Sequence, residues 1–73
     1  MAQKQSQPYW RRARFGDNWE FVRRRPGGGP TIWFGTVEPV IDGRCGYSTP
    51  LGRAYAPTLD EAKQAVEQIA ANL

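Results

Sequence analysis

Histidine is absent from this 73-residue chain, and cysteine occurs only once, as Cys45. Without histidine, the chain has no side chain that ordinarily titrates near neutral pH, and neither a Ser–His nor a Cys–His pair can form. A single thiol can neither close an intramolecular disulfide nor fill a tetrahedral zinc site. We therefore expect a protein that is not an enzyme and that uses no metal and no cofactor, with Cys45 as a small buried hydrophobe.

Long apolar runs are also missing, so no segment reaches the length needed to cross a bilayer. No apolar stretch follows Lys4, which argues against a secretory signal, and a lone thiol is typical of a cytoplasmic protein. The expected location is therefore the cytoplasm. A chain of this length forms one domain at most, and three Trp, three Tyr and three Phe could fill its modest core. Self-association is the other route to stability.

The charged residues are unevenly distributed along the chain. Residues 1–57 contain nine basic and four acidic residues, a net charge of +5, whereas residues 58–73 contain one basic and three acidic residues, a net charge of −2. Such asymmetry favours a basic face for an anionic partner. Arginines that only keep a small sheet soluble would give the same composition.

Two aromatic and basic segments near the N-terminus are typical of a β-hairpin. Residues 1–8 are polar and predict a disordered tail, which leaves residues 9–73 as the single domain. The segments at 9–15 and 19–25 then flank a Gly-Asp-Asn triplet at 16–18, which favours a turn. The sequence therefore predicts that the two segments pair as antiparallel strands.

Pro-Gly-Gly-Gly-Pro at residues 26–30 interrupts any regular element. A glycine-rich run could indicate a phosphate-binding loop, but such a loop ends in Gly-Lys-Ser/Thr and leads into a helix. Here a proline and a predicted strand follow. We therefore expect a mobile hairpin loop.

Further strands are predicted after this loop. The β-branched and aromatic residues 31–37 predict a central strand that Pro39 ends. Asp-Gly at 42–43 is a hairpin-turn signal, and a strand at 44–48 follows it. Residues 53–56 could add a short edge strand before the next proline.

The C-terminal segment carries a helix start signal and helical spacing. Thr58 and Glu61 form a capping box. One apolar stripe at spacings of three and four follows, made of Leu59, Ala62, Val66, Ile69 and Leu73. The stripe could cover a sheet or form a helix–helix dimer seam, and the short helix favours the sheet. We therefore predict an α+β fold: a three- to four-stranded antiparallel β-meander with one C-terminal α-helix packed on one face.

Residues 52–63, Gly-Arg-Ala-Tyr-Ala-Pro-Thr-Leu-Asp-Glu-Ala-Lys, join the last strand to this helix. The stretch resembles the strand–Thr-x-x-Glu-Ala–helix ending of many small phage and prophage proteins. It is also similar to the ending of the arm-type DNA-binding domains of tyrosine recombinases, three-stranded sheets with one helix in which the sheet enters the DNA groove. The resemblance implies a fold type. Small phage proteins also include inhibitors of host machinery, such as anti-CRISPR proteins.

Arginine supplies eight of the ten basic residues. Guanidinium groups bind phosphate or carboxylate in a bidentate way and stack on aromatic rings. If the first two strands pair, we expect the arginine runs at 11–14 and 23–25 to come together as a basic patch with aromatic neighbours, which suits nucleic acid. The candidate partner-binding residues are Arg11, Arg12, Arg14, Arg23, Arg24, Arg25, Arg44 and Arg53 for phosphate, and Trp10 or Trp33 for stacking.

Three binding functions remain open. The first is contact with nucleic acid through an Arg/Trp-rich sheet face. The second is binding to an acidic protein surface, as a phage-encoded inhibitor of host machinery would do. The third is a homodimer that buries the uncovered sheet face, on which Trp33 and Val37 would lie. All three require that the helix covers one face of the sheet and leaves arginine and tryptophan side chains on the other.

Overall fold

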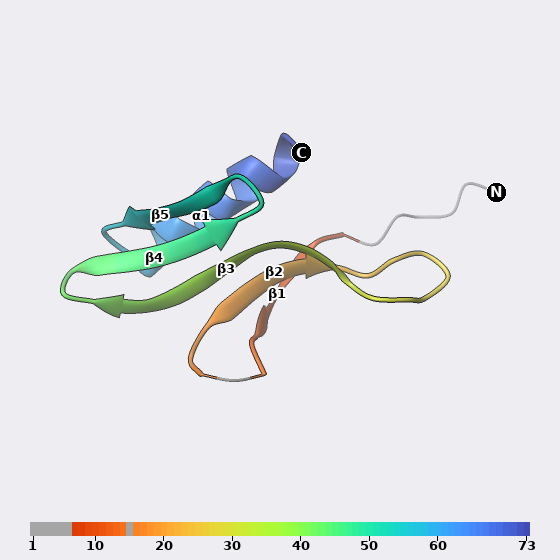
Figure 1. Ribbon diagram of the computed structural model, residues 1–73, viewed down its shortest axis with the longest axis horizontal. Helices are drawn as coiled ribbons and strands as arrows, with labels where there is room; N and C mark the ends of the chain where they lie inside the picture. The colour runs from red at the N-terminus through yellow and green to blue at the C-terminus, as the bar shows by residue number, and fades with distance from the viewer. Residues whose placement is uncertain (1–6, 15) are drawn as a thin grey trace.

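Five strands and one helix make up the fold in the computed structural model, which describes residues 7–14 and 16–73 (Figure 1). In chain order they are β1 (Tyr9–Arg12), β2 (Trp19–Arg23), β3 (Ile32–Ile41), β4 (Arg44–Thr49), β5 (Gly52–Ala56) and α1 (Leu59–Ala71). The strands form one antiparallel sheet in the order β1-β2-β3-β4-β5. The predicted α+β class and the β-meander are thus confirmed.

The sheet has more strands than the three to four predicted, because short segments complete both of its edges. β1 has four residues and β5 has five, and each residue has a partner on the neighbouring strand. Both lie within segments for which the sequence indicated strands, at 9–15 and 53–56, so the predicted total of three to four was too low. The tail predicted at residues 1–8 falls mostly on residues 1–6, which lie outside the described residues, and Gln7 and Pro8 have no regular structure.

β3 continues past Pro39, where the sequence predicted its end. Proline has no amide hydrogen to give to a neighbouring strand. The pairing of β3 with β4 shifts register between Val37 and Val40, and this irregularity accommodates the proline inside the strand. β3 therefore has ten residues and reaches Ile41, so the prediction of a strand end at Pro39 is wrong.

Asp42 and Gly43 form the predicted hairpin turn between β3 and β4. Both residues have a positive φ, 53° for Asp42 and 72° for Gly43. These angles fit a type I′ turn, whose twist matches that of paired strands and which favours Asp-Gly. The turn residues therefore fix the start of β4 where the sequence predicted it.

α1 begins where the capping box predicted. The Thr58 hydroxyl accepts a hydrogen bond from the Glu61 amide, with 3.2 Å between N and Oγ1. Ala62 and Val66 are buried. Leu73 lies beyond the end of the helix and is 60% exposed, so the predicted apolar stripe contains one residue too many. Among the described residues, no helix has the length and apolar character needed to span a membrane.

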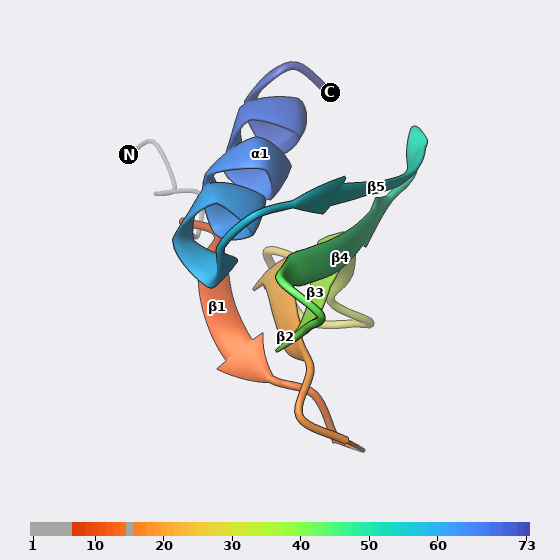
Figure 2. The same ribbon diagram turned by 90° about the vertical axis from the view of Figure 1, so that its left-hand side faces the viewer.

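α1 lies against one face of the sheet, and the sheet curves so that β1 and β5 flank the helix (Figure 2). The helix comes so close at Gly35 that a Cβ atom there would lie 2.6 Å from Cγ1 of Val66. The buried core between the two layers consists of Phe21, Val37, Cys45, Ala62 and Val66. The helix therefore packs on the sheet as predicted. The other side of the sheet, called the uncovered face below, has no described element over it.

An extra residue in β3 changes the alternation of its side chains. Residues 21 and 22 of β2 pair with Gly35 and Trp33, so Phe34 between them has no partner on β2. Because one extra residue interrupts the period of two, Phe34 packs on the core while Trp33 lies on the uncovered face. Val37 is buried on the covered face. The prediction that Trp33 and Val37 share the uncovered face is therefore wrong.

Candidate binding surface on the uncovered sheet face

The uncovered face presents side chains from all five strands. Residues directly opposite one another in antiparallel strands point to the same face, so the register identifies the members. They are Tyr9, Arg11, Glu20, Val22, Trp33, Thr36, Ile41, Arg44, Gly46, Ser48, Arg53 and Tyr55. Glu38 joins them through its hydrogen bonds to Arg53. Four of the ten residues proposed from the sequence belong to this set: Arg11, Trp33, Arg44 and Arg53.

The two arginine runs do not come together, although the strands that carry them pair as predicted. Arg12 lies opposite Trp19 beside the β1–β2 turn, whereas Arg23 lies at the other end of β2. Four residues of strand, about 13 Å, separate the two levels. Antiparallel pairing aligns two runs only if both lie equally far from the turn. The prediction of one converged basic patch is therefore wrong.

Trp10 lies on the covered face and attaches α1 to β1. Its ring packs against Phe21, with 4.8 Å between ring centroids. Its Nε1 donates a hydrogen bond to Oε1 of Glu67 on α1 at 3.0 Å, and the Lys63 ammonium lies 5.3 Å from its ring centroid. Trp10 therefore packs against the helix and is not available to a partner that binds the uncovered face.

Arg12 and Arg23 also lie on the covered face, each over an aromatic ring. The guanidinium carbon of Arg12 is 5.1 Å from the ring centroid of Trp19, and its Nη2 is 3.1 Å from a carboxylate oxygen of Asp17. The guanidinium carbon of Arg23 is 5.8 Å from the ring centroid of Phe34. Both side chains thus cover rings at the edge of the core, which is a packing role.

Arg11 lies on the uncovered face near the β1–β2 turn, where its charge is partly neutralised. Its Nε is 3.3 Å from Oε1 of Glu20, which lies directly opposite on β2. Arg14 is exposed just beyond β1 and lines an open depression together with Arg11, Arg12 and Glu20. This end of the sheet, called the turn end, also carries the β3–β4 turn.

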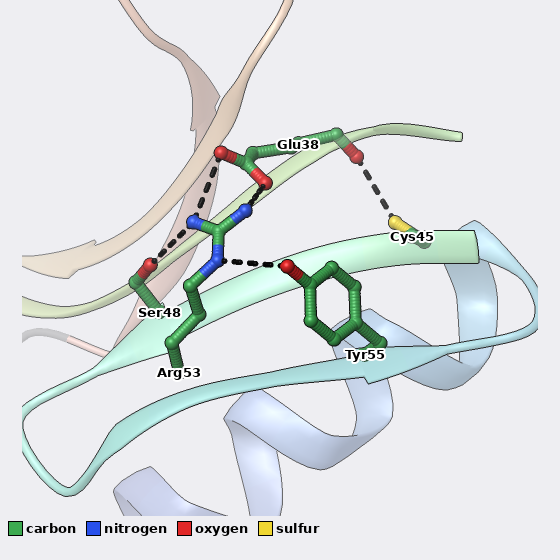
Figure 3. Close-up of polar contacts among 5 residues, drawn as sticks. All are labelled: Glu38, Cys45, Ser48, Arg53 and Tyr55. Atoms are coloured by element: carbon green, nitrogen blue, oxygen red, sulfur yellow. Dashed lines mark hydrogen bonds and ion pairs between the residues drawn. The ribbon is translucent and has the colours of Figure 1, made fainter. Parts of the chain in front are cut away.

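A network centred on Arg53 occupies the part of the uncovered face formed by β3, β4 and β5 (Figure 3). The Arg53 guanidinium binds the Glu38 carboxylate through both terminal nitrogens, with 3.1 Å between Nη1 and Oε1. Nη1 also donates to the Ser48 hydroxyl and Nε to the Tyr55 hydroxyl, each at 3.5 Å. Four of the five guanidinium N–H groups thus have acceptors within the chain.

This network crosses over β4 at Gly46, where no side chain intervenes. A Cβ atom at Gly46 would lie 2.9 Å from Nη2 of Arg53 and closer still to the Glu38 carboxylate. The hydrogen bonds to Glu38 and then to Tyr55 raise the pKa of Arg53 above its ordinary value. Arg53 therefore joins β5 to β3, and few of its donors remain for a phosphate.

Cys45 lies beneath this network on the covered face. The thiol is buried and donates a hydrogen bond to the Glu38 carbonyl oxygen at 3.0 Å. Burial, followed by the Glu38 charge, raises the pKa of Cys45. The thiol therefore stays protonated and weakly reactive, which confirms the prediction of a buried hydrophobe. Within residues 7–14 and 16–73, no cluster of three or more metal-ligating side chains occurs.

The opposite end of the uncovered face, called the loop end, carries a row of apolar side chains beside the β2–β3 loop. Tyr9, Val22 and Trp33 lie side by side on β1, β2 and β3. Tyr9 is 37% and Trp33 is 40% exposed, while Val22 between them is only 1% exposed. Nε1 of Trp33 donates to Oγ1 of Thr36 at 2.9 Å, which fixes the indole on the sheet. Two partly exposed rings thus flank one buried valine.

Two arginines without an ion pair among the described residues follow directly after β2, at this end of the sheet. Arg24 and Arg25 are both exposed. Nε of Arg25 donates to the Pro30 carbonyl oxygen at 2.9 Å across the loop. Within residues 7–14 and 16–73, neither arginine has an ion pair. The sequence from Phe21 to Val37, which forms β2, the loop and most of β3, contains no acidic residue.

Arg44 is the matching exposed arginine at the turn end. It lines an open depression of about 350 Å³ together with Ile41 and Tyr55, and it makes no ion pair within the described part of the chain. Asp42 and Glu38 line the same depression. Arg44 therefore shares with Arg24 its exposure and its lack of an ion pair, but it lies among carboxylates.

We define the loop-end surface as Tyr9, Val22, Trp33, Arg24 and Arg25. The sequence indicated Trp33 and the two arginines but not Tyr9 and Val22. Only the strand register could have identified these two, because it places them beside Trp33. The chain matches no protein-family model, no curated protein and no solved structure.

Proposed function

We propose that this protein is a non-enzymatic binding module that contacts nucleic acid through the loop-end surface. The observation that carries the proposal is the combination of two partly exposed rings, Tyr9 and Trp33, with two arginines that have no carboxylate partner among the described residues. Rings provide stacking platforms for bases, and guanidinium groups bind phosphate. We further propose that the protein acts in the cytoplasm.

The distribution of charge supports the loop end over the rest of the uncovered face. At the turn end, Glu20 and Glu38 lie on the same face and would repel phosphate, and their arginine partners are already paired. At the loop end, no acidic residue occurs between Phe21 and Val37. Glu67 of α1 lies near Arg23 on the covered face. Phosphate contacts supply much of the affinity of nucleic-acid binding, so the loop end of the uncovered face is the favoured side.

A protein partner is the second candidate. The turn end exposes Ile41 by 67% and Tyr55 by 58% beside Arg44. Tyrosine and arginine are enriched among the residues that dominate protein interfaces. A phage-encoded inhibitor that binds an acidic protein, or a homodimer, would use such a patch.

Salt-titrated binding to labelled DNA and RNA oligonucleotides tests the proposal. Replacing Arg24 by Gln should weaken binding and reduce the steepness of log affinity against log salt by about 0.7 to 1. The matched control is Arg44→Gln, which removes the same charge from another exposed, unpaired arginine and should change affinity much less.

Two results would oppose the proposal. Absence of binding to every oligonucleotide at low salt would remove it. Equal losses in Arg24→Gln and Arg44→Gln would show that binding depends on overall charge and not on the loop-end surface.

A further inference from the structure

We infer that the nucleic acid is single-stranded and that two of its bases, splayed apart, stack on Tyr9 and Trp33. This inference rests on the proposed function and adds the class of nucleic acid. It follows from the spacing of the two rings, from the fixed position of the indole and from the position of the arginines.

The spacing of the rings does not suit a continuous base stack. Tyr9 and Trp33 lie on β1 and β3 with Val22 of β2 between them in the register. Neighbouring strands are about 4.8 Å apart, which places the two side chains about 10 Å apart. Stacked neighbouring bases rise by only about 3.4 Å along one strand. Bases on the two rings therefore cannot be stacked neighbours, and a single strand can separate them freely.

The ring of Trp33 is prepared for stacking. Its only donor, Nε1–H, is already used in the hydrogen bond to Thr36, so the indole needs no polar partner from the ligand. The same bond restricts the rotation of the side chain, which lowers the entropy that binding would otherwise cost. Buried Val22 forms the floor between the rings.

The arginines follow β2 at the same end of the sheet as the two rings. Arg24 follows β2, two residues after Val22. The Arg25 side chain spans the loop through its hydrogen bond to the Pro30 carbonyl oxygen. The loop is open around Gly27 and Gly28. If either glycine carried a Cβ atom, no described atom other than those of its chain neighbours would lie within 4 Å of it. A sugar–phosphate chain could therefore approach this part of the loop without displacing other side chains.

The test compares a single strand with a duplex of the same sequence, using the intact chain. The single strand should bind more tightly. Trp33→Leu should weaken its binding about 5- to 150-fold, because one base stack is lost, and Trp33→Phe should retain most of the affinity. Tyr9→Leu should also weaken binding, whereas Tyr55→Leu, the same change at an exposed tyrosine of the same face, should not.

Fluorescence separates Trp33 from the other two tryptophans. A single strand should quench the wild-type protein, and this quenching should disappear in Trp33→Phe. Circular dichroism spectra matching the wild type would show that each variant is folded.

Failure of this inference differs from failure of the proposed function. If the duplex binds at least as tightly as the single strand, or if folded Trp33→Leu binds normally while Arg24→Gln does not, stacking on the rings is refuted and phosphate binding at the loop end remains. If no oligonucleotide binds, both are refuted.

Discussion

Replacement of Gly35 by alanine should weaken the packing of the helix on the sheet. A Cβ atom at residue 35 would lie 2.6 Å from Cγ1 of Val66, 2.9 Å from the Ser48 carbonyl oxygen and 3.3 Å from Cγ2 of Val66. Val66 is fully buried and the oxygen belongs to the backbone, so neither can move without displacing α1 or β4. The change therefore adds volume to a closed part of the core.

The expected loss of stability follows from two opposing effects. Overpacking a core by one methyl group costs about 1–3 kcal/mol. Alanine also restricts the unfolded chain more than glycine, which returns about 0.4–1 kcal/mol. We expect a net loss of about 1–2 kcal/mol in the free energy of unfolding. For a domain of this size, that corresponds to a fall in Tm of roughly 4–16 °C.

Urea denaturation followed by circular dichroism measures this change. The double variant Gly35→Ala/Val66→Ala supplies the control, because it removes the methyl groups that the new Cβ would meet. Its loss of stability should be smaller than the sum of the two single losses, by about 0.5–3 kcal/mol. A Gly35→Ala protein as stable as the wild type would refute the close contact between α1 and β3, and with it the assignment of covered and uncovered faces.

Two further predictions concern the helix cap and the buried thiol. Thr58→Ala should lower the free energy of unfolding by about 1 kcal/mol, because the Glu61 amide loses its acceptor, and the same urea assay would contradict this if the midpoint did not change. Because the folded pKa of Cys45 is raised above its ordinary value of 9.0, the unfolded thiol should ionise first. The stability that Cys45 contributes should therefore be fully present below pH 9 and decline as the pH rises through its folded pKa. Urea titrations at several pH values should show a weaker decline in Cys45→Ala, and identical pH dependence in the two proteins would contradict this account.

The parts of the fold that could be predicted depend on neighbouring residues in the sequence. Thr58 and Glu61 lie one helical turn apart, so the start of α1 was predictable from the sequence. The same holds for the turn at Asp42 and Gly43, whose backbone angles suit few other residue pairs. Local chemistry decides both features, and distant parts of the chain do not alter them.

The errors concern features that depend on a partner strand. Pro39 ends a strand only if its neighbour requires an amide hydrogen there, and the register shift removes that requirement. The two arginine runs would converge only if both lay equally far from the β1–β2 turn. The strand register sets these distances, and the positions of the basic residues in the sequence do not reveal it. Trp10 was proposed as a stacking residue, but its contact with Glu67 spans 57 positions and could not be inferred locally.

The candidate site was predictable in composition but not in location. Trp33, Arg24 and Arg25 are chemically conspicuous, and the sequence identified all three. Tyr9 joins them only because β1 pairs with β2 in one particular register. Shifting that pairing by one residue would turn Tyr9 toward the helix and expose Trp10 in its place.

The unpaired Phe34 has a consequence for how deletions and substitutions would act on this chain. Removing Phe34 would restore strict alternation in β3 and would leave Trp33 three positions before Val37, so the two side chains would stay on opposite faces. The deletion would take away a ring that packs on the core, but the indole would remain on the uncovered face. A deletion of one residue at this position would therefore damage the core and spare the exposed ring, whereas a substitution at Trp33 alone would do the reverse.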